Sequence, residues 1–278
     1  MLFRYTHRTV AREFVLIATA LVFCIPLYLL LTMSLKTTSE VYTAPLSLPK
    51  SLNFSSYSNA WKNAGPSGMG HALFVSATMT VGSVVCLIAI GSLTAYTLAR
   101  RTGRMSTFLY LLFLIGIILP FQLGMIPLYV VMRDVGLTGT VFGMIVLYTG
   151  MLMPLTVFLY TGFIRVLPRA YEEAAQVDGA NLRRTYTRVV FPLLRPVTGT
   201  VAVLTGIIIW NDFFLPLVFL SGTNNEPIPV ALYSFVGNYV SQWNVIFAAV
   251  AISVLPILIF YLFAQRELIR GFAGGIRG

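Results

Sequence analysis

Charged side chains are scarce in this sequence: Asp, Glu, Lys and Arg make up only 10% of its 278 residues. Soluble domains carry about 25% charged residues. Hydrophobic residues account for 57% of the chain, and the mean hydropathy is +0.83. These values exclude an ordinary soluble domain and indicate an integral membrane protein.

Residues for catalysis or metal binding are also missing. The chain has two cysteines, Cys24 and Cys86, both inside apolar runs, and two histidines, His7 and His71. This excludes a disulfide framework and a Cys/His metal site. No stretch matches the nucleotide-binding pattern G-x-x-x-x-G-K-[ST], and no Ser/His/Asp set or carboxylate pair is visible. We therefore expect a non-catalytic protein without metal or cofactor, driven, if it works against a gradient, by another chain.

Long apolar runs predict the membrane topology. A helix needs about 20 apolar residues to cross the hydrocarbon core. Six runs qualify: 14–33, 70–99, 107–131, 141–164, 197–220 and 245–264. The first is predicted to be a retained anchor, because it exceeds the usual apolar length of a signal peptide and no A-x-A site follows it. The sequence thus predicts an all-α polytopic protein with one membrane domain, 1–278.

The positive charges predict the orientation. The net charge of +10 comes from residues between the apolar runs, so membrane lipid and not nucleic acid is the expected partner. With the N-terminus inside, fifteen Lys and Arg residues fall on the inner side and four on the outer side. Because cationic loops resist translocation, both termini are predicted to be cytoplasmic.

The long inner segment 165–196 is predicted to form a helix, a corner and a second helix. Pro168 suits a helix start, and Glu172 and Glu173 favour the helix dipole near that start. Gly179 offers a corner at low steric cost. The residues leave two interpretations open: a hairpin that docks a partner, or an amphipathic hairpin that lies on lipid headgroups.

The second helix of this segment is predicted over about Asn181–Val190. Arg183, Arg184 and Arg188 lie on it beside apolar residues. Pro192 is predicted to end it.

The order Glu173-Ala174-Ala175, Gly179 and Val189-x-Phe191-Pro192 resembles the EAA loop of ABC importer permeases, with full spacing and apolar replacements at two positions. In that family the loop forms coupling helices that fit a cleft in the ATPase subunit. The resemblance implies the type I ABC importer permease (MetI-like) fold in a prokaryotic plasma or inner membrane. It assigns ATPase coupling to Glu172, Glu173, Ala174, Ala175, Asp178, Gly179 and Pro192.

Further stretches resemble the smaller permease subunit of maltose-type carbohydrate importers. They are Asp178-Gly179-Ala180, Trp210-Asn211-Asp212-Phe213 with Pro216-Leu217, and the tail 265–278. The resemblance implies carbohydrate import, a second permease subunit, two ATPase subunits that bind ATP-Mg, and an extracytoplasmic binding protein. Alternatives are import of another solute, such as a glycerol-phosphate ester or a polyamine, and a secondary transporter.

Polar residues in or near the spans suggest a path for the solute. Gln122, Asn211 and Asp212 are candidates to line it. A carboxylate inside a span usually faces a wet cavity or the bundle interior, so Asp212 has a second interpretation as a polar pin between helices. In the third span, Pro120 and Pro127 are predicted to bend the helix. Gly91-x-x-x-Ala95 predicts close helix packing.

The outer loop 221–244 resembles the element that approaches the binding protein. Amides and aromatic rings suit sugar hydroxyls and ring faces. The candidate contacts are Asn224, Asn225, Tyr233, Tyr239 and Trp243. The other interpretation is an ordinary polar loop with an interfacial aromatic belt.

Overall fold

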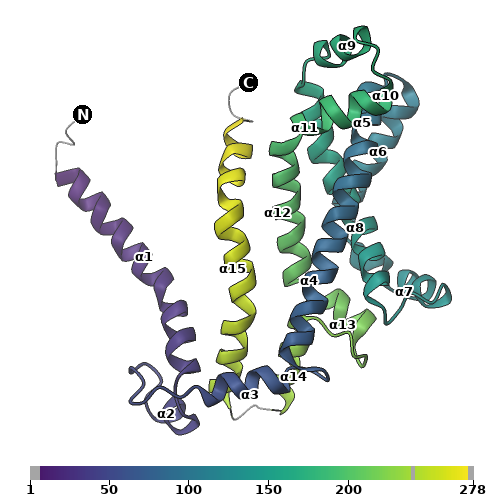
Figure 1. Cartoon of the computed structure of the whole chain (residues 1–278). Coiled ribbons are helices and arrows are strands. Elements are labelled where there is room, and N and C mark those ends of the chain that lie inside the picture. Colours follow the sequence, from purple (N-terminus) through teal and green to yellow (C-terminus); the bar gives the residue numbers. More distant parts are fainter. Residues whose placement is uncertain (1–6, 239–241, 275–278) are drawn as a thin grey trace. The chain divides into compact units, whose positions relative to one another are not determined.

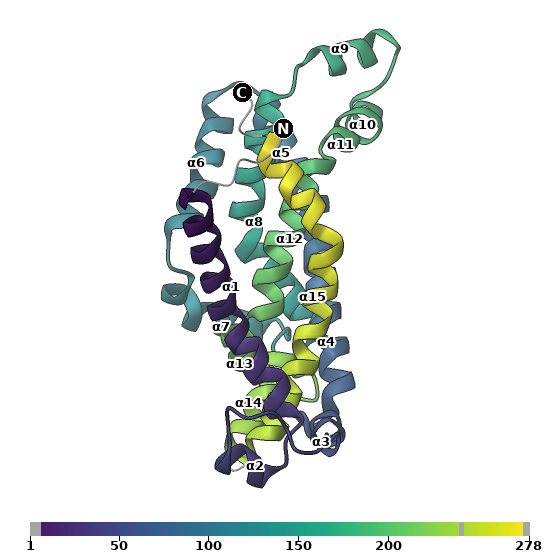
Figure 2. The same cartoon turned by 90° about the vertical axis from the view of Figure 1, so that its left-hand side faces the viewer.

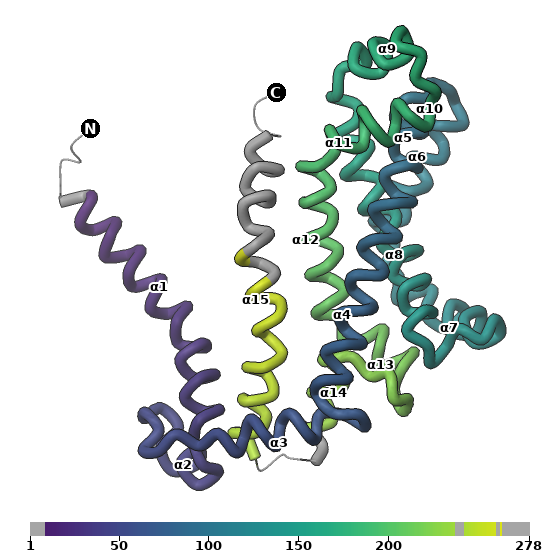
Figure 3. The backbone as a smooth tube through the Cα atoms, in the orientation of Figure 1, coloured from purple at the N-terminus to yellow at the C-terminus, as the bar shows by residue number. Residues whose placement is uncertain are grey.

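The structure, a computed structural model, describes residues 7–238 and 242–274, with the side chains of residues 9–236, 242–259 and 262 (Figure 3). Every regular element in these ranges is a helix (Figure 1). This confirms the predicted all-α class. The chain forms two compact units, one of Met1–Gly70 with Ala231–Leu255 and one of His71–Val230 with Pro256–Gly278.

The first unit begins with a long apolar helix, α1 (His7–Ser34). Phe14 and Phe23 on this helix are each more than 70% exposed, which suits a helix surrounded by lipid. Two short helices follow, α2 (Thr38–Thr43) and α3 (Ser55–Asn63). The unit also holds the end of α14 (Ile228–Asn238) and α15 (Trp243–Gly274) as far as Leu255.

Buried polar side chains hold the segments of the first unit together. Lys36 is fully buried, and its Nζ donates to the carbonyls of Ala44 and Pro45 at 2.7 and 2.8 Å. The amide of Asn244 donates to Ser56 Oγ at 2.9 Å and accepts from Thr38 Oγ1 at 3.2 Å. Because buried polar groups are costly unless paired, these contacts fix the loop after α1 against the start of α15.

The second unit is built around two long helical stretches. One runs through α4 (Gly68–Cys86), the π-helix η1 (Leu87–Gly91) and α5 (Ser92–Arg100), and the other is α8 (Val141–Val166). Small residues let them approach closely. A Cβ on Gly82 would lie 2.6 Å from Ile145 Cδ1, and one on Gly91 would overlap Thr156. With Ala95 fully buried beside them, the structure confirms the predicted close packing.

Two buried clusters form the interior of the second unit. One joins α4, α8 and the region around α13, and includes Met79, Leu147, Tyr148 and Phe219. The other joins α5 and α8 to the inner segment and includes Tyr160. Helix association in lipid depends on such packing and on hydrogen bonds between helices. Tyr160 supplies both, because its hydroxyl also donates to Thr198 Oγ1 at 2.9 Å.

The predicted third span, 107–131, is not one straight helix. The chain forms α6 (Arg104–Ile118), a 3₁₀ turn η2 (Phe121–Gly124) and α7 (Met125–Asp134), with a bend of 95°. Leu119 is extended because it precedes Pro120. The predicted bend is therefore present at Pro120, whereas Pro127 lies inside α7.

The predicted fifth span, 197–220, is also divided. Helix α12 (Arg195–Asn211) ends where Asp212 becomes extended, and α13 (Phe214–Leu220) follows. Asp212 Oδ1 accepts a hydrogen bond at 3.0 Å from the amide of Phe214, the first residue of α13. Pro26, Pro154 and Pro256, in contrast, lie inside continuous helices.

Each of the six predicted apolar runs coincides with helix in the structure. Among the described residues, three helices are long and apolar enough to cross a membrane: Thr9–Ser34, Gly68–Arg100 and Val141–Val166. Two bent pairs raise the number to five, namely Arg104–Ile118 with Phe121–Asp134 and Leu182–Leu193 with Arg195–Asn211. Trp243–Ile259 is a shorter apolar helix. Six crossings therefore remain a prediction.

Candidate functional site

The first arm of the inner hairpin is helix α9 (Ala170–Val177). Helix α8 ends at Val166 because Leu167 precedes Pro168 and is extended. At the other end of α9, Gly179 has φ +78°. The amides of Gly179 and Ala180 donate to the carbonyls of Gln176 and Ala175 at 3.0 and 2.9 Å. These two bonds form a Schellman motif, so the predicted corner at Gly179 is confirmed.

The second arm contains α10 (Leu182–Arg184), the π-helix η3 (Thr185–Val190) and α11 (Phe191–Leu193). Asn181 caps it, since its Oδ1 accepts from the Arg184 amide at 2.9 Å. The prediction that Pro192 ends the helix is wrong. The helix continues to Leu193, and a bend of 71° separates it from α12. We attribute this to the wide π turn just before Pro192, which gives room for a ring that would otherwise clash with the preceding turn.

An ion pair anchors α9 to the end of α5. Arg100 Nε donates to Glu172 Oε1 at 2.7 Å, and the two side chains are 12% and 10% exposed. The Tyr96 hydroxyl donates to the other carboxylate oxygen of Glu172 at 3.0 Å. Arg100 Nη2 also donates to the Leu167 carbonyl at 3.0 Å. Glu172 is thus a structural anchor of the hairpin.

The second arm is anchored to the same helix through Tyr186. Its hydroxyl shares a 2.7 Å hydrogen bond with Ser92 Oγ, and its ring packs against Tyr96 and Phe191 at centroid distances of 5.3 and 6.0 Å. Burial raises the pKa of Tyr186, partly opposed by the hydrogen bond with Ser92, so the phenol stays neutral at physiological pH. Both arms are therefore held by α5.

Several apolar side chains near the corner are exposed. Val177 is 87% exposed, Leu182 67% and Tyr171 51%. Glu173, Ala174, Asp178 and Gly179 are exposed as well, whereas Ala175 is half-buried. We call this set, Tyr171, Glu173, Ala174, Val177, Asp178, Gly179 and Leu182, the corner surface. Figures 1 and 2 both show α9 and α10 at the end of the unit where α5 lies. Exposed apolar surfaces occur at protein–protein and at membrane contact sites, so the two interpretations of the hairpin both stay open at this point.

The candidate path residues do not form one cluster. Gln122 is exposed in the 3₁₀ turn η2, and the Asn211 amide donates to the Ile207 carbonyl of its own helix at 2.9 Å. Asp212 Oδ2 accepts from the Tyr148 hydroxyl at 2.8 Å, while Oδ1 accepts from the Phe214 amide at the start of α13. Both oxygens of Asp212 are engaged within the chain, which favours its interpretation as a pin between helices.

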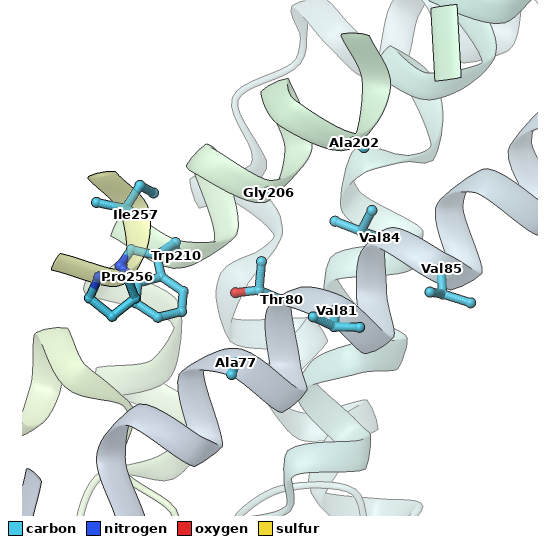
Figure 4. Close-up of a pocket in the computed structure, with 10 residues that line it drawn as sticks. All are labelled: Ala77, Thr80, Val81, Val84, Val85, Ala202, Gly206, Trp210, Pro256 and Ile257. Carbon is cyan, nitrogen blue, oxygen red and sulfur yellow. The ribbon is translucent and has the colours of Figure 1, made fainter. Parts of the chain in front are cut away.

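A cavity of about 210 Å³ lies between α4, α12 and α15 (Figure 4). Trp210 and Pro256 form part of its wall, and Thr80 has the one side-chain hydroxyl in the lining. The Thr80 hydroxyl is buried and has no hydrogen-bond partner in the described part of the chain. A sugar needs many polar partners, so this apolar cavity does not resemble a sugar subsite.

The outer-loop residues fall into both units. Asn225 belongs to the second unit, and its amide donates to the Gly139 carbonyl at 3.1 Å; Asn224 is its neighbour. Tyr233 and Trp243 belong to the first unit and are 57% and 45% exposed. Part of the predicted loop is helix α14. Tyr239 and the side chains of the tail 265–278 lie outside the described residues.

The sequence did not single out Tyr96, Arg100 and Tyr186, which hold the hairpin. Arg100 was one of fifteen inner cations, and the tyrosines were two of 14. One signal was present in the sequence. Arg100 is the last residue of α5, and the first turn of α9 carries the acidic residues Glu172 and Glu173, which are of opposite charge. Only the fold shows that the two are in contact.

Comparison with known proteins gives the family. Residues 87–273 match the model of the family described as binding-protein-dependent transport system inner membrane component. The melibiose/raffinose/stachyose import permease MelC of Bacillus subtilis is 34% identical, covering 96% of this chain and 97% of that relative. The probable starch degradation products transport system permease AmyC of Thermoanaerobacterium thermosulfurigenes is 35% identical, covering 93% of each chain.

A solved structure supports the fold independently. A chain of a bacterial ABC transporter involved in the import of the acidic polysaccharide alginate superposes with a TM-score of 0.81. The match covers 95% of this chain and 98% of that chain at 23% sequence identity. At this identity the likeness shows the fold alone.

Proposed function

Because this chain belongs to the family of binding-protein-dependent transport system inner membrane components, we propose that it is a permease subunit of an ATP-binding-cassette importer for a carbohydrate. The observation that carries the proposal is the corner surface, an exposed tip with both apolar and acidic side chains on a hairpin that is fixed at its base to α5. The tip offers a contact for another chain, and the base transmits any displacement to the spans.

The proposed mechanism follows from this construction. Closure of ATP-Mg-bound ATPase subunits would push or pull the corner surface. The ion pair of Arg100 with Glu172 and the hydrogen bond of Tyr186 with Ser92 would pass that motion to α5. Since α5 packs along α8, the helices would shift between inward and outward access. In this mechanism the chain provides the docking contact and the helices that move, whereas ATP is hydrolysed on the partner ATPase subunits.

The proposed assembly has a second permease subunit, two ATPase subunits and an extracytoplasmic binding protein in a prokaryotic plasma or inner membrane. Fifteen inner against four outer cations support cytoplasmic termini. Asn224, Asn225, Tyr233 and Trp243 are the described candidates for contact with the binding protein.

Two relatives support the substrate class. Both are named for import of sugars or of starch degradation products, and both align over more than nine-tenths of this chain. The Trp210-Asn211-Asp212-Phe213 stretch and the tail 265–278 carry the same resemblance in the sequence. We therefore propose a sugar or an oligosaccharide as the transported solute.

Uptake by a deletion strain tests the function. We expect the strain that lacks this chain to lose uptake of at least one labelled sugar from a panel of mono- and oligosaccharides, and the restored gene to recover it. Loss of uptake of a glycerol-phosphate ester or a polyamine alone would overturn the carbohydrate class. Uptake that persists without any ATPase subunit would contradict the assignment of this chain to an ATP-binding-cassette importer.

Substitution of Gly179 tests the docking contact in the same strain. A Cβ at Gly179 meets nothing within 4 Å, so Gly179→Asp adds bulk and charge on the corner surface without a clash inside the chain. We expect it to abolish uptake while the protein stays in the membrane.

Gly179→Ala is the matched control. It shares the cost of a positive φ, about 1 kcal/mol, but adds only a methyl group, and it should retain most uptake. Normal uptake by Gly179→Asp would contradict the coupling role.

A further inference from the structure

A second cavity, of about 510 Å³, lies between α5 and the second arm of the hairpin. Three arginines reach its wall: Arg100 and Arg101 at the end of α5, and Arg183 on α10. Leu93 and Leu182 add apolar surface, each more than half exposed. The wall of the cavity therefore combines cationic side chains with apolar ones.

The charges of two of these arginines are not compensated. Arg100 is neutralised by Glu172 at 2.7 Å. The side chains of Arg101 and Arg183 are exposed and make no ion pair with any residue that the structure describes. A planar guanidinium binds phosphate oxygens through two parallel hydrogen bonds. Two unpaired guanidinium groups at one cavity thus favour a phosphate group.

An apolar track leads to these arginines along the helical stretch α4–η1–α5. Ile90 and Leu93 are each 51% exposed. Towards the end of α5 the exposed side of the helix changes to Thr97 and then Arg101. An exposed apolar stretch that ends in arginines matches an acyl chain that ends in a charged headgroup, and basic pockets of this kind bind anionic lipids.

We propose that this cavity binds the phosphate headgroup of an anionic phospholipid of the cytoplasmic leaflet. The phosphate lies between Arg101 and Arg183, and an acyl chain follows Leu93 and Ile90. Because Arg101 follows α5 and Arg183 belongs to the hairpin, the lipid joins the two and supports the anchor formed by Glu172. The site requires the cytoplasmic orientation of the hairpin proposed above, and it shares Leu182 with the corner surface.

Native mass spectrometry of the purified full-length chain with its co-expressed partner subunits tests the proposal. The probes are phosphatidylglycerol and phosphatidylcholine with identical acyl chains. We expect selective retention of phosphatidylglycerol. Arg101→Gln with Arg183→Gln should lower this retention by about fivefold for each arginine lost. The control, Arg188→Gln, removes an exposed arginine of η3 that does not line the cavity, and it should retain the lipid.

Four results would overturn the proposal. The first is equal retention of the two lipids, and the second is an equal loss in the Arg188→Gln control. The third is displacement of phosphatidylglycerol by millimolar inorganic phosphate, which would mark a site for a free anion. Retention by the isolated chain but not by the assembled complex would assign the surface to a partner subunit and would also count against it.

Discussion

Two adjacent glutamates of the inner hairpin have different roles. Glu172 is buried and holds Arg100 and Tyr96, whereas Glu173 is exposed. The resemblance to the EAA loop placed the motif at Glu173, and the sequence alone could not separate the neighbours. Both lie in the first turn of a helix, and only the direction in which each side chain points distinguishes them.

Substitution of each glutamate by glutamine tests this difference. Glu172→Gln leaves the mostly buried charge of Arg100 without its partner, and we expect a loss of about 3 kcal/mol in stability. Glu173→Gln, an isosteric change one residue away, should leave the melting temperature of the purified complex within experimental error.

Double substitution extends the comparison. Arg100→Met with Glu172→Gln removes both charges and should recover part of the stability lost by Glu172→Gln. Equal melting temperatures for the two single glutamine variants would show that Glu172 is not the anchor.

At the scale of elements, the sequence predicted where helices lie better than where they bend. Each of the six apolar runs falls mainly on helix in the described residues, because hydrophobic length is encoded locally, but two of the runs are divided by a break. The break at Asp212 depends on its contacts with Tyr148 and with the Phe214 amide. Pro120 breaks a helix, but Pro154 lies inside the unbroken α8, so proline alone does not predict an interruption. Tertiary packing decides which helices stay continuous.

The contact of the π-helix η1 with α8 gives a prediction at this scale. Gly91→Ala would place a methyl group in overlap with Thr156 Cγ2, and overpacking of this kind costs about 1–3 kcal/mol. We expect a lower melting temperature. Thr156→Ser removes that methyl group and should restore much of the loss in the double variant.

Gly150→Ala is the control for the same change in an open position of α8, since nothing lies within 4 Å of its added Cβ. It should not destabilise the protein. If Gly91→Ala were as stable as Gly150→Ala, the close packing of α5 and η1 on α8 would be wrong.

At the scale of the whole molecule, the chain has the features of a membrane transport component. Its sequence has no nucleotide-binding pattern, and its family is a transport component. Composition predicts the membrane class. Motif spacing and the position of Gly179 predict the hairpin and its corner, and the charge bias predicts the side of the membrane on which the hairpin lies. The sequence does not predict the anchors on α5 and the cationic cavity, because they join residues about 70 to 90 positions apart in the chain.

The central claim is that the corner surface contacts an ATPase subunit, and site-specific photo-crosslinking tests it most directly. A photoreactive amino acid at the exposed position Ala174 should form an adduct with the ATPase subunit in cells that keep uptake, and in open membranes from these cells the adduct yield should change when ATP-Mg is added. The same probe at Val135, which is 61% exposed and lies between the predicted spans 107–131 and 141–164 on the expected outer side, should form none. Absence of the adduct at Ala174 in transporting cells, or equal adducts at both positions, would contradict the account.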